Sequence, residues 1–93
     1  MNLPVNYNDL SVTYKRMVRE EYQWQQRGIC CHCGELLSEN PSIEVLNMNI
    51  NKQLFPKGFF NWPIHLHHNH ETGMTIGAVH NRCNAALWQY YGE

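Results

Sequence analysis

The four cysteines and six histidines of this 93-residue chain all lie in two short stretches. "ICCHC" spans residues 29–33, and "HLHHNHETGMTIGAVHNRC" spans residues 65–83. Thiolate and imidazole groups are good Zn²⁺ ligands, and a neutral imidazole can also accept a proton near pH 7. We expect these side chains to form two sites, one that holds a metal to stabilise the fold and one that carries out chemistry.

The metal site is expected from two knuckles of the same spacing, Cys30-x-x-Cys33 and His80-x-x-Cys83. Two residues between ligands let both side chains of a tight turn reach one ion, and four ligands complete a tetrahedral zinc site. Zinc bound in this way would contribute much of the folding free energy of so small a chain. The alternative is a set of buried free thiols with an unrelated His80. Cys31 is expected to pack and His32 to be exposed, because Cys31-x-Cys33 is too tight for the usual turn.

Four further histidines crowd into a single short run, at positions His65, His67, His68 and His70. An extended strand would present them on both of its faces, and burying so many unpaired imidazoles is costly. They could form a solvated polar strand, a second metal-binding site or a catalytic site. The amide of Asn84 directly follows the last predicted zinc ligand, and it favours the catalytic alternative.

The elements that must position these residues begin with a helix predicted over residues 8–27, with Asn8 and Ser11 as candidate caps. Its apolar residues recur at helical spacing: Leu10, Tyr14, Met17, Val18 and Tyr22. Gly28 is suited to end the helix, and the first knuckle follows over residues 28–37.

The second half of the chain is predicted to contain a hairpin and a closing helix. Residues 38–63 are expected to form a connecting excursion with a short strand, because apolar residues partly alternate there and Asn and Pro interrupt them. Two strands are expected around a turn at Glu71 to Gly73, followed by a helix with Asn81 as its cap. Since His67 and His68 are adjacent, they can serve one site only if the strand ends or bulges there.

The composition is that of a globular chain, with 43% hydrophobic residues and a net charge of −1. The N-terminus lacks the basic and apolar regions of a signal peptide, and no stretch is long enough to span a membrane. We therefore expect a single cytoplasmic domain with reduced cysteines and no membrane partner. The net charge does not favour a generally basic nucleic-acid binder, but local cations are present. They are Lys15, Arg16, Arg19, Lys57 and Arg82.

The chain resembles the HNH or ββα-metal (His-Me finger) nucleases in three strings that occur in order: "GICCHCGELL", "HLHHNHE" and "GAVHNRCNAAL". The likeness is to the phage recombination endonuclease VII type in particular, and it covers residues 14–90 with the middle segment unmatched. It implies an α+β fold, a small zinc-stapled ββα-metal domain with an N-terminal helix. The whole chain, residues 1–93, would be one HNH nuclease domain with its ββα motif at residues 64–92.

The resemblance also implies a role for each site residue. His68 corresponds to the general base, His67 and Asn84 to ligands of a catalytic divalent metal, and His70 to an accessory active-site histidine. The structural zinc ligands would be Cys30, Cys33, His80 and Cys83. The chain departs from the endonuclease VII pattern at two positions, because that pattern has Asp in place of His67 and Cys in place of His80. Other HNH nucleases use His at the first position, and the second exchange is conservative for zinc.

The function that the resemblance implies is metal-dependent hydrolysis of DNA. A histidine base would activate water and one divalent metal (Mg²⁺, Mn²⁺, Co²⁺ or Ni²⁺) would assist, leaving 5′-phosphate and 3′-hydroxyl ends. DNA would be met in the cytoplasm, or in the host cytoplasm for a phage-encoded enzyme, and cutting of both strands would suggest a homodimer. The alternative is a non-catalytic zinc-stapled DNA-binding or adaptor domain, which would need neither Asn84 nor the adjacent His67 and His68.

Overall fold

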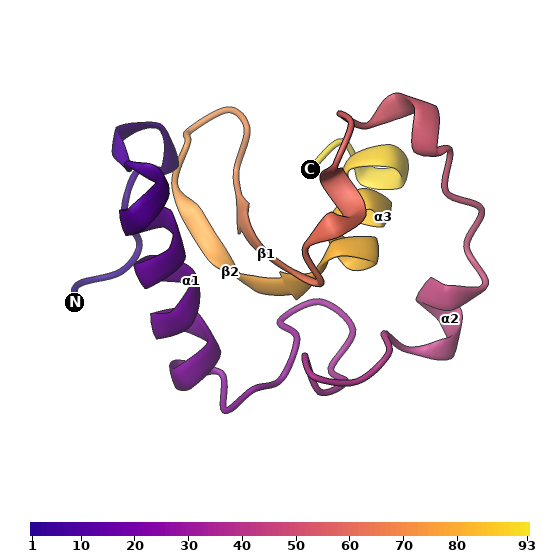
Figure 1. Ribbon diagram of the computed structural model, residues 1–93, viewed down its shortest axis with the longest axis horizontal. Coiled ribbons are helices and arrows are strands. Elements are labelled where there is room, and N and C mark those ends of the chain that lie inside the picture. Colours follow the sequence, from indigo (N-terminus) through magenta and orange to yellow (C-terminus); the bar gives the residue numbers. More distant parts are fainter.

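A β-hairpin lies between two helices in the computed structural model, which describes all 93 residues (Figure 1). The helix α1 spans Val12–Gln25, the strands β1 and β2 span Ile64–His68 and Thr75–His80, and the helix α3 spans Asn81–Tyr91. The two strands form one antiparallel sheet, which both helices contact. The predicted α+β class is confirmed. None of the helices has the length and apolar character needed to cross a membrane.

The boundaries of α1 are set by a side-chain cap and a left-handed turn. The Ser11 hydroxyl accepts a hydrogen bond from the Tyr14 N–H at 3.2 Å, which confirms Ser11 as the cap. Asn8 is wrong as a cap, because it lies in the separate 3-10 turn η1 (Tyr7–Asp9). Beyond the last turn of the helix Gly28 has a φ of 75°, a conformation that favours glycine and that ends the helix as predicted.

The buried stripe of α1 is narrower than its apolar residues predict. Val18 and Tyr22 are buried, whereas Tyr14 and Met17 are exposed. The Tyr22 hydroxyl lies 2.9 Å from the hydroxyl of Thr75, and this hydrogen bond joins α1 to the beginning of β2. The helix is therefore fixed against the hairpin by a few contacts on one side.

The register of the hairpin shifts between His67 and His68. His67 pairs with Gly77, whereas His68 pairs with Thr75, so that Ile76 is left without a partner. A bulge of this kind bends the strands and increases their twist. The pairing is therefore irregular beside the two adjacent histidines, with the extra residue in β2.

Asn69 closes the turn of the hairpin. Its side-chain oxygen accepts hydrogen bonds from the N–H groups of Glu71 and Thr72, at 2.8 and 3.0 Å. The Gly73 N–H donates to the Asn69 carbonyl at 2.7 Å, and Gly73 has a φ of 78°. The predicted turn at Glu71 to Gly73 is confirmed.

The outer edge of β2 is covered by a side chain. The Ala78 N–H donates to Gln26 Oε1 at 2.8 Å, and Gln26 Nε2 donates to the Ala78 carbonyl at 2.9 Å. A Cβ at Gly77 would lie 2.7 Å from Gln26 Oε1 and 2.8 Å from Cys31 Sγ, so a larger residue would force these side chains to move. The amide satisfies backbone groups that could otherwise pair with another chain, and it fixes the segment after α1.

The connecting excursion at residues 38–63 contains no strand, so the predicted short strand is wrong. It contains the helix α2 (Ile43–Leu46) and two 3-10 turns, η2 (Lys52–Leu54) and η3 (Phe59–Asn61). The Ser42 hydroxyl caps α2 by accepting from the Val45 N–H at 3.4 Å. Val45 is buried, but Ile43 is 64% exposed, so the alternating residues do not share a buried sheet face.

Arg82 holds this excursion against α3. Its guanidinium donates to the carbonyls of Val45, Leu46 and Met48, at 3.2, 3.1 and 2.6 Å. These carbonyls lie at the C-terminal end of α2, where a helix has no internal donors left. Arg82 is therefore a structural residue and not a free cation for phosphate.

Asn81 anchors the beginning of α3, but it does not cap the helix as predicted. His80 occupies the N-cap position, and no side chain caps the helix. The Asn81 amide donates instead to the carbonyls of Phe60 and Trp62, at 3.2 and 2.9 Å. The cap prediction is wrong because Asn81 lies inside the helix and its amide holds η3 in place.

Replacing Gln26 with alanine is expected to lower the free energy of unfolding by about 1–3 kcal/mol, because the buried Ala78 N–H loses its acceptor. Gln25→Ala is the matched control. Gln25 is exposed and hydrogen-bonds Glu21 within its own helix, so its replacement should change stability by about 0.5 kcal/mol or less. Urea unfolding at saturating zinc compares the two variants. Equal stabilities would show that the pairing of this amide with β2 contributes nothing.

Candidate metal centre and histidine site

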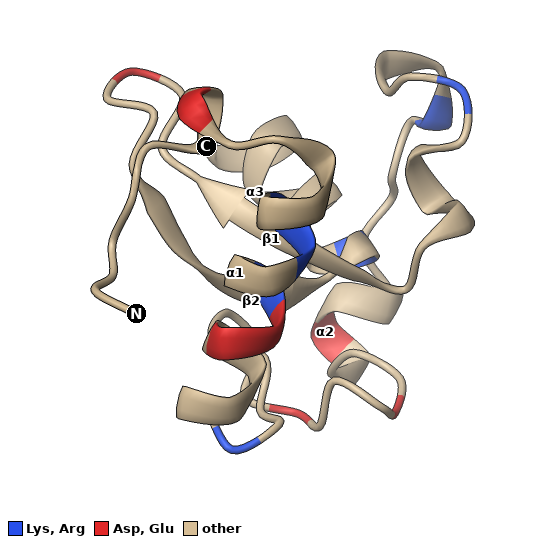
Figure 2. Cartoon of the chain, turned by 60° about the vertical axis from the view of Figure 1, so that its left-hand side comes forward, with Lys and Arg blue, Asp and Glu red and all other residues tan.

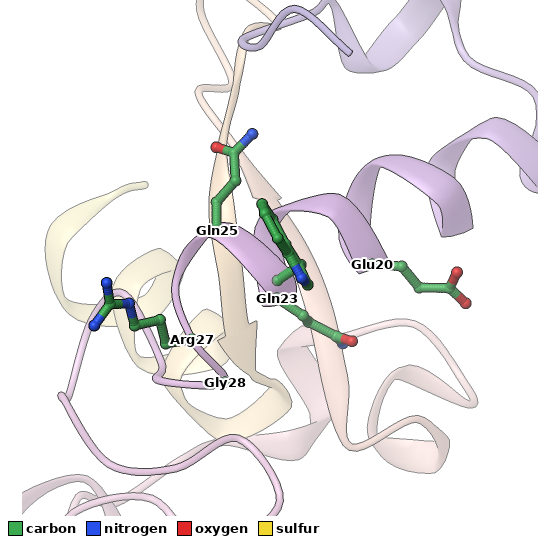
Figure 3. Close-up of a pocket in the computed structure, with 6 residues that line it drawn as sticks. Glu20, Gln23, Gln25, Arg27 and Gly28 are labelled. Atoms are coloured by element: carbon green, nitrogen blue, oxygen red, sulfur yellow. The ribbon is translucent and has the colours of Figure 1, made fainter.

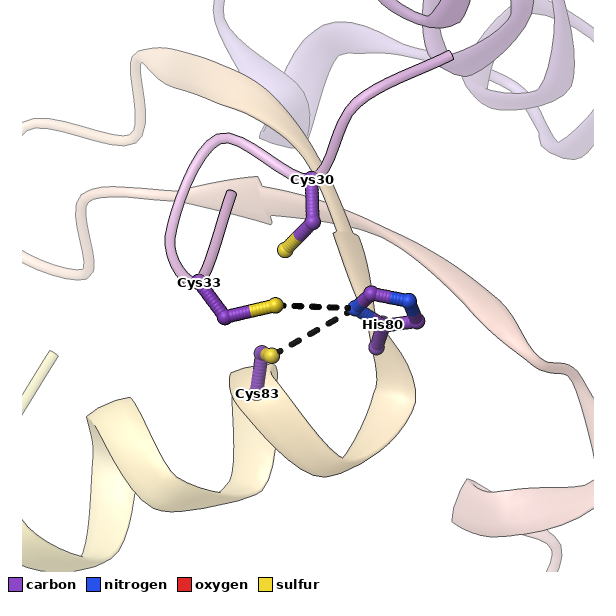
Figure 4. A group of neighbouring side chains, drawn as sticks. All are labelled: Cys30, Cys33, His80 and Cys83. Atoms are coloured by element: carbon purple, nitrogen blue, oxygen red, sulfur yellow. Dashed lines mark hydrogen bonds between the residues drawn. The ribbon is translucent and has the colours of Figure 1, made fainter. Parts of the chain in front are cut away.

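Four side chains from two distant parts of the chain converge on one point: Cys30, Cys33, His80 and Cys83 (Figure 4). Their ligand atoms all lie within 4.8 Å of one another. The first two belong to the turn after α1, which is closed by a 3.1 Å hydrogen bond from the Gly34 N–H to the Cys30 carbonyl. The other two lie at the end of β2 and in the first turn of α3. The structure thus brings the two predicted knuckles together.

The hydrogen bonds of His80 determine which ring nitrogen faces the sulfurs. Its Nε2 lies 2.9 Å from the Leu36 carbonyl oxygen and 3.0 Å from that of Glu39. A carbonyl can only accept, so Nε2 carries the proton and Nδ1 keeps its lone pair. Nδ1 is the atom that points at Cys33 and Cys83 (Figure 4). The two carbonyls therefore orient the ring as outer partners of a metal-binding histidine do.

The spacing of the donor atoms fits a tetrahedral ion. His80 Nδ1 lies 3.5 Å from Cys33 Sγ and 3.6 Å from Cys83 Sγ. A nitrogen and a sulfur bound to tetrahedral zinc at their usual bond lengths are also about 3.5 Å apart. Cys30 and Cys83 are buried, where thiolates need a cation. The group can therefore hold a structural metal such as zinc.

The thiols of Cys30 and Cys83 shift each other's pKa in opposite directions. A hydrogen bond from the Cys83 thiol lowers the pKa of Cys30 to about 4, although burial opposes this shift. The same bond raises the pKa of Cys83, and burial adds to the rise. A divalent cation would replace the shared proton and stabilise both thiolates.

Cys31 and His32 lie within the first knuckle but outside the metal group. Both residues are exposed. Cys31 Sγ lies next to Gly77, and the Cys31 N–H donates to the Ala78 carbonyl at 3.2 Å. Cys31 therefore packs against β2, and neither residue belongs to the set of ligands.

The strand histidines do not converge as the first group does. No second group of three or more His, Cys or acidic side chains shares one point. His67 is buried, His65 and His68 are half-buried, and His70 is exposed. A metal centre built from three of these imidazoles is therefore not formed, and a second ion would need a ligand of another kind.

His65 orients the amide that could supply such a ligand. Its Nε2 lies 2.8 Å from the Phe59 carbonyl oxygen, so Nε2 donates and Nδ1 is left as an acceptor. Asn84 Nδ2 donates to that Nδ1 at 3.1 Å. Burial lowers the pKa of His65, which keeps the ring neutral in this role. The NH₂ group of Asn84 is thus held by β1, and its oxygen is left for another partner.

His67 lies beside this amide. Burial lowers the pKa of His67, and the nearby Asn84 side chain opposes the shift. His67 is 3% exposed, and its Nδ1 is the one buried side-chain nitrogen or oxygen in the chain without a hydrogen-bond partner. Such atoms are rare in folded proteins and call for a physical explanation. A buried ring nitrogen without a partner is free to bind a cation, and the oxygen of Asn84 is a candidate second ligand.

His68 follows the register shift, and its ring lies 4.7 Å from the ring of His70 between their centroids. Burial lowers the pKa of His68 to about 4, and its neighbours His70, His67 and Lys15 add to the shift. The imidazole is therefore neutral at pH 7 and able to accept a proton. The approach of an anionic phosphate would raise this pKa.

Two cations of α1 act on the same site. Beyond burial, Lys15 lowers the pKa of His68, and Arg19 lowers the pKa of His65. Arg16 instead forms an exposed 4.0 Å ion pair one turn along the helix, so its charge is partly balanced. Figure 2 shows basic and acidic residues sharing α1. The positive charge near the histidines thus comes from one side of a helix of mixed charge.

A hollow at the C-terminal end of α1 is separate from this site (Figure 3). It is lined by Glu20, Gln23, Trp24, Gln25, Arg27 and Gly28. Glu20 and Arg27 point away from each other, and no histidine or cysteine takes part. No set of reacting groups converges there.

No family model, curated protein or solved structure matches the chain. The function must therefore be inferred from the residues themselves.

Two contributions to the histidine site are not predicted by the sequence. The first is the bond between Asn84 and His65, which nothing in the sequence motifs foresees. Strand alternation gives a signal for it, because His65 and His67 share a face. Tyr7, which stacks on His68, gives no such signal because the two residues are far apart in the sequence.

Cys33→Ser is expected to abolish zinc retention or to unfold the chain, because it removes one of the four converging ligands. Cys31→Ser is the matched control, a neighbouring thiol outside the group, and it should keep one zinc per chain. Metal content after gel filtration and far-UV circular dichroism provide the measurements. Equal loss of metal in both variants would contradict the ligand assignment.

Proposed function

We propose that this chain is a metal-dependent DNA endonuclease of the HNH (His-Me finger) type, in which the hairpin and α3 form a zinc-stapled ββα-metal domain. The observation that carries this proposal is the buried Nδ1 of His67, which has no hydrogen-bond partner, on the strand whose His65 holds the amide of Asn84. The neutral His68 follows directly in the chain. These three side chains provide two ligands and one base.

His68 would act as the general base. Its imidazole is neutral at pH 7, so the ring can take a proton from the attacking water. As the new bond from water to phosphorus forms, the bond from phosphorus to the 3′ oxygen breaks, and that oxygen takes up a proton. The products are a 5′-phosphate and a 3′-hydroxyl. The anionic phosphate would raise the low pKa of His68 and make the ring a stronger base.

His67 and Asn84 would hold one divalent cation, such as Mg²⁺, Mn²⁺, Co²⁺ or Ni²⁺. When bound, such a cation supplies positive charge to the phosphate oxygens and to the leaving oxygen. Two protein ligands leave coordination positions open for DNA, in contrast to the four ligands of the cysteine group. His65 keeps the NH₂ group of Asn84 occupied, so that the amide oxygen remains available.

The remaining polar groups suit the backbone of DNA. His70 is exposed beside His68 and can contact a phosphate. Lys15 and Arg19 add positive charge at the same place, which attracts a polyanion without regard to sequence. One chain carries one such site and makes one cut at a time, so concerted cleavage of both strands would suggest a homodimer.

Conversion of supercoiled plasmid to open circles tests this function, with Mn²⁺ or Mg²⁺ added and with EDTA as the control. Zinc content is measured after the chelator treatment, because loss of the structural metal would also abolish activity. Nicking that depends on the added metal supports an endonuclease. DNA binding without nicking would instead favour the non-catalytic DNA-binding or adaptor domain.

His68→Ala should reduce the cleavage rate by about 10²- to 10⁴-fold while zinc content, fold and DNA binding are retained, because only the base is removed. His32→Ala is the matched control, since His32 is an exposed histidine outside both sites. Plasmid nicking rates and a DNA-binding assay are compared for the two variants. If His68→Ala cleaves within a few-fold of wild type, the base lies elsewhere.

His67→Asp should shift the preferred metal toward Mg²⁺. The wild-type ligands, an imidazole and an amide, are neutral, and Mg²⁺ prefers hard anionic oxygen. We therefore expect the wild-type chain to work better with Mn²⁺, Co²⁺ or Ni²⁺ than with Mg²⁺ at equal concentration. The measurement is the cleavage rate against the concentration of each metal. An unchanged ranking in an active His67→Asp variant would mean that His67 does not touch the catalytic ion.

A further inference from the structure

The ring of His68 is not held in place by hydrogen bonds. His65 and His80 each donate through Nε2 to backbone carbonyls, which fixes the planes of their rings. Neither ring nitrogen of His68 has a hydrogen-bond partner in the chain. An unrestrained imidazole rotates about its Cβ–Cγ bond, so a base that must face one water needs another constraint.

Stacking provides that constraint. The rings of Tyr7 and His68 are nearly parallel, with centroids 3.9 Å and planes 9° apart. The ring of His70 lies near that of His68 as well, at a centroid distance of 4.7 Å and an angle of 46°. The lone pair that accepts a proton lies in the plane of an imidazole, so a partner stacked on the face leaves that lone pair accessible.

Tyr7 is itself held firmly against the hairpin. Its N–H donates to the Gly73 carbonyl at 2.8 Å. Val5 and Thr75 are joined by two further bonds, from the Val5 N–H to the Thr75 hydroxyl at 3.0 Å and from the Thr75 N–H to the Val5 carbonyl at 2.8 Å. Because Thr75 is also the register partner of His68, the N-terminal segment is fixed beside the bulge.

Glycine at position 73 lets the N-terminal segment lie close to the turn of the hairpin. A Cβ there would lie 2.7 Å from Asn6 Oδ1 and 2.9 Å from Asn8 Nδ2. On α1, the ammonium of Lys15 lies 4.1 Å from the centroid of the Tyr7 ring. A cation at this distance from an aromatic ring is attracted to it, so Lys15 further restrains Tyr7.

We propose that Tyr7 is a positioning residue that holds the plane of the His68 imidazole by stacking, so that its ring nitrogen faces the attacking water. This role rests on the endonuclease function proposed above. The aromatic ring of Tyr7 is the part that acts, because its hydroxyl makes no hydrogen bond in the chain. Tyr7 touches neither DNA nor metal in this role and acts only through His68.

The test compares Tyr7→Phe, Tyr7→Leu and the control Tyr14→Leu in the zinc-loaded chain. Tyr14 is an exposed tyrosine of α1 and is 57% accessible. Tyr7→Leu should lower kcat for plasmid nicking with Mn²⁺ by about 10- to 100-fold with KM unchanged, since a misplaced reacting group slows the chemical step. Tyr7→Phe should restore kcat because the stack is kept, and Tyr14→Leu should match wild type.

A second measurement does not depend on activity or on the folding of the Leu variant. In ¹H NMR spectra the ring protons of His68, assigned through His68→Ala, should show an upfield ring-current shift in the wild type and in Tyr7→Phe. Absence of this shift in the wild type overturns the inference. An unchanged kcat in Tyr7→Leu, or an equal loss in Tyr7→Phe and Tyr7→Leu, overturns it as well.

These experiments distinguish a wrong endonuclease function from a wrong role for Tyr7. If the wild-type chain does not nick DNA with any divalent metal, the endonuclease function is wrong and the role of Tyr7 falls with it. If the wild type nicks DNA and Tyr7→Leu does so equally well, the function stands and the role of Tyr7 alone is wrong.

Discussion

The Cys30, Cys33, His80 and Cys83 group joins the two halves of the chain where β2 becomes α3. Only 16 of the 93 residues are buried, so apolar burial alone gives a small core, and a bound ion would carry much of the coupling between α1, the hairpin and α3. Cys30 and Cys83 belong to the apolar core as well as to the metal group. Because Asn84 follows Cys83 directly, an ion bound by this group would also help to place one member of the histidine site.

Thr75 links the elements that surround this site. It hydrogen-bonds Val5 of the N-terminal segment and Tyr22 of α1, and it is the register partner of His68 across the bulge. A regular hairpin would point His67 and His68 to opposite faces. The irregular pairing, the helix and the N-terminal segment therefore meet at one buried threonine, and the position of His68 depends on all three.

The sequence predicts the local features of this structure, because there a residue type at a short spacing allows only one geometry. The paired knuckles, the Ser11 cap and the turn that ends at Gly73 are of this kind. The HNH assignment itself stays a prediction. Contacts between residues far apart in the sequence, such as Gln26 with Ala78, have no local pattern that reveals them.

In the connecting excursion a local pattern is present, but it predicts a strand where the chain forms a short helix. Ile43 and Val45 alternate as in a strand, but the Ser42 cap and the distant Arg82 guanidinium satisfy the two ends of a short helix. The same excursion supplies the Phe59 carbonyl that sets the tautomer of His65. A segment that resembles no motif thus determines which atom of Asn84 is available at the histidine site.

His80 lowers the negative charge of the metal group. Three thiolates and a neutral imidazole around a divalent ion leave a single negative charge, whereas four thiolates would leave two. With an ion bound, this charge would lie one residue along the chain from Asn84, and electrostatic repulsion is screened poorly inside a protein. In the proposed endonuclease, an imidazole in place of one thiolate would therefore repel bound DNA less than a four-cysteine centre would.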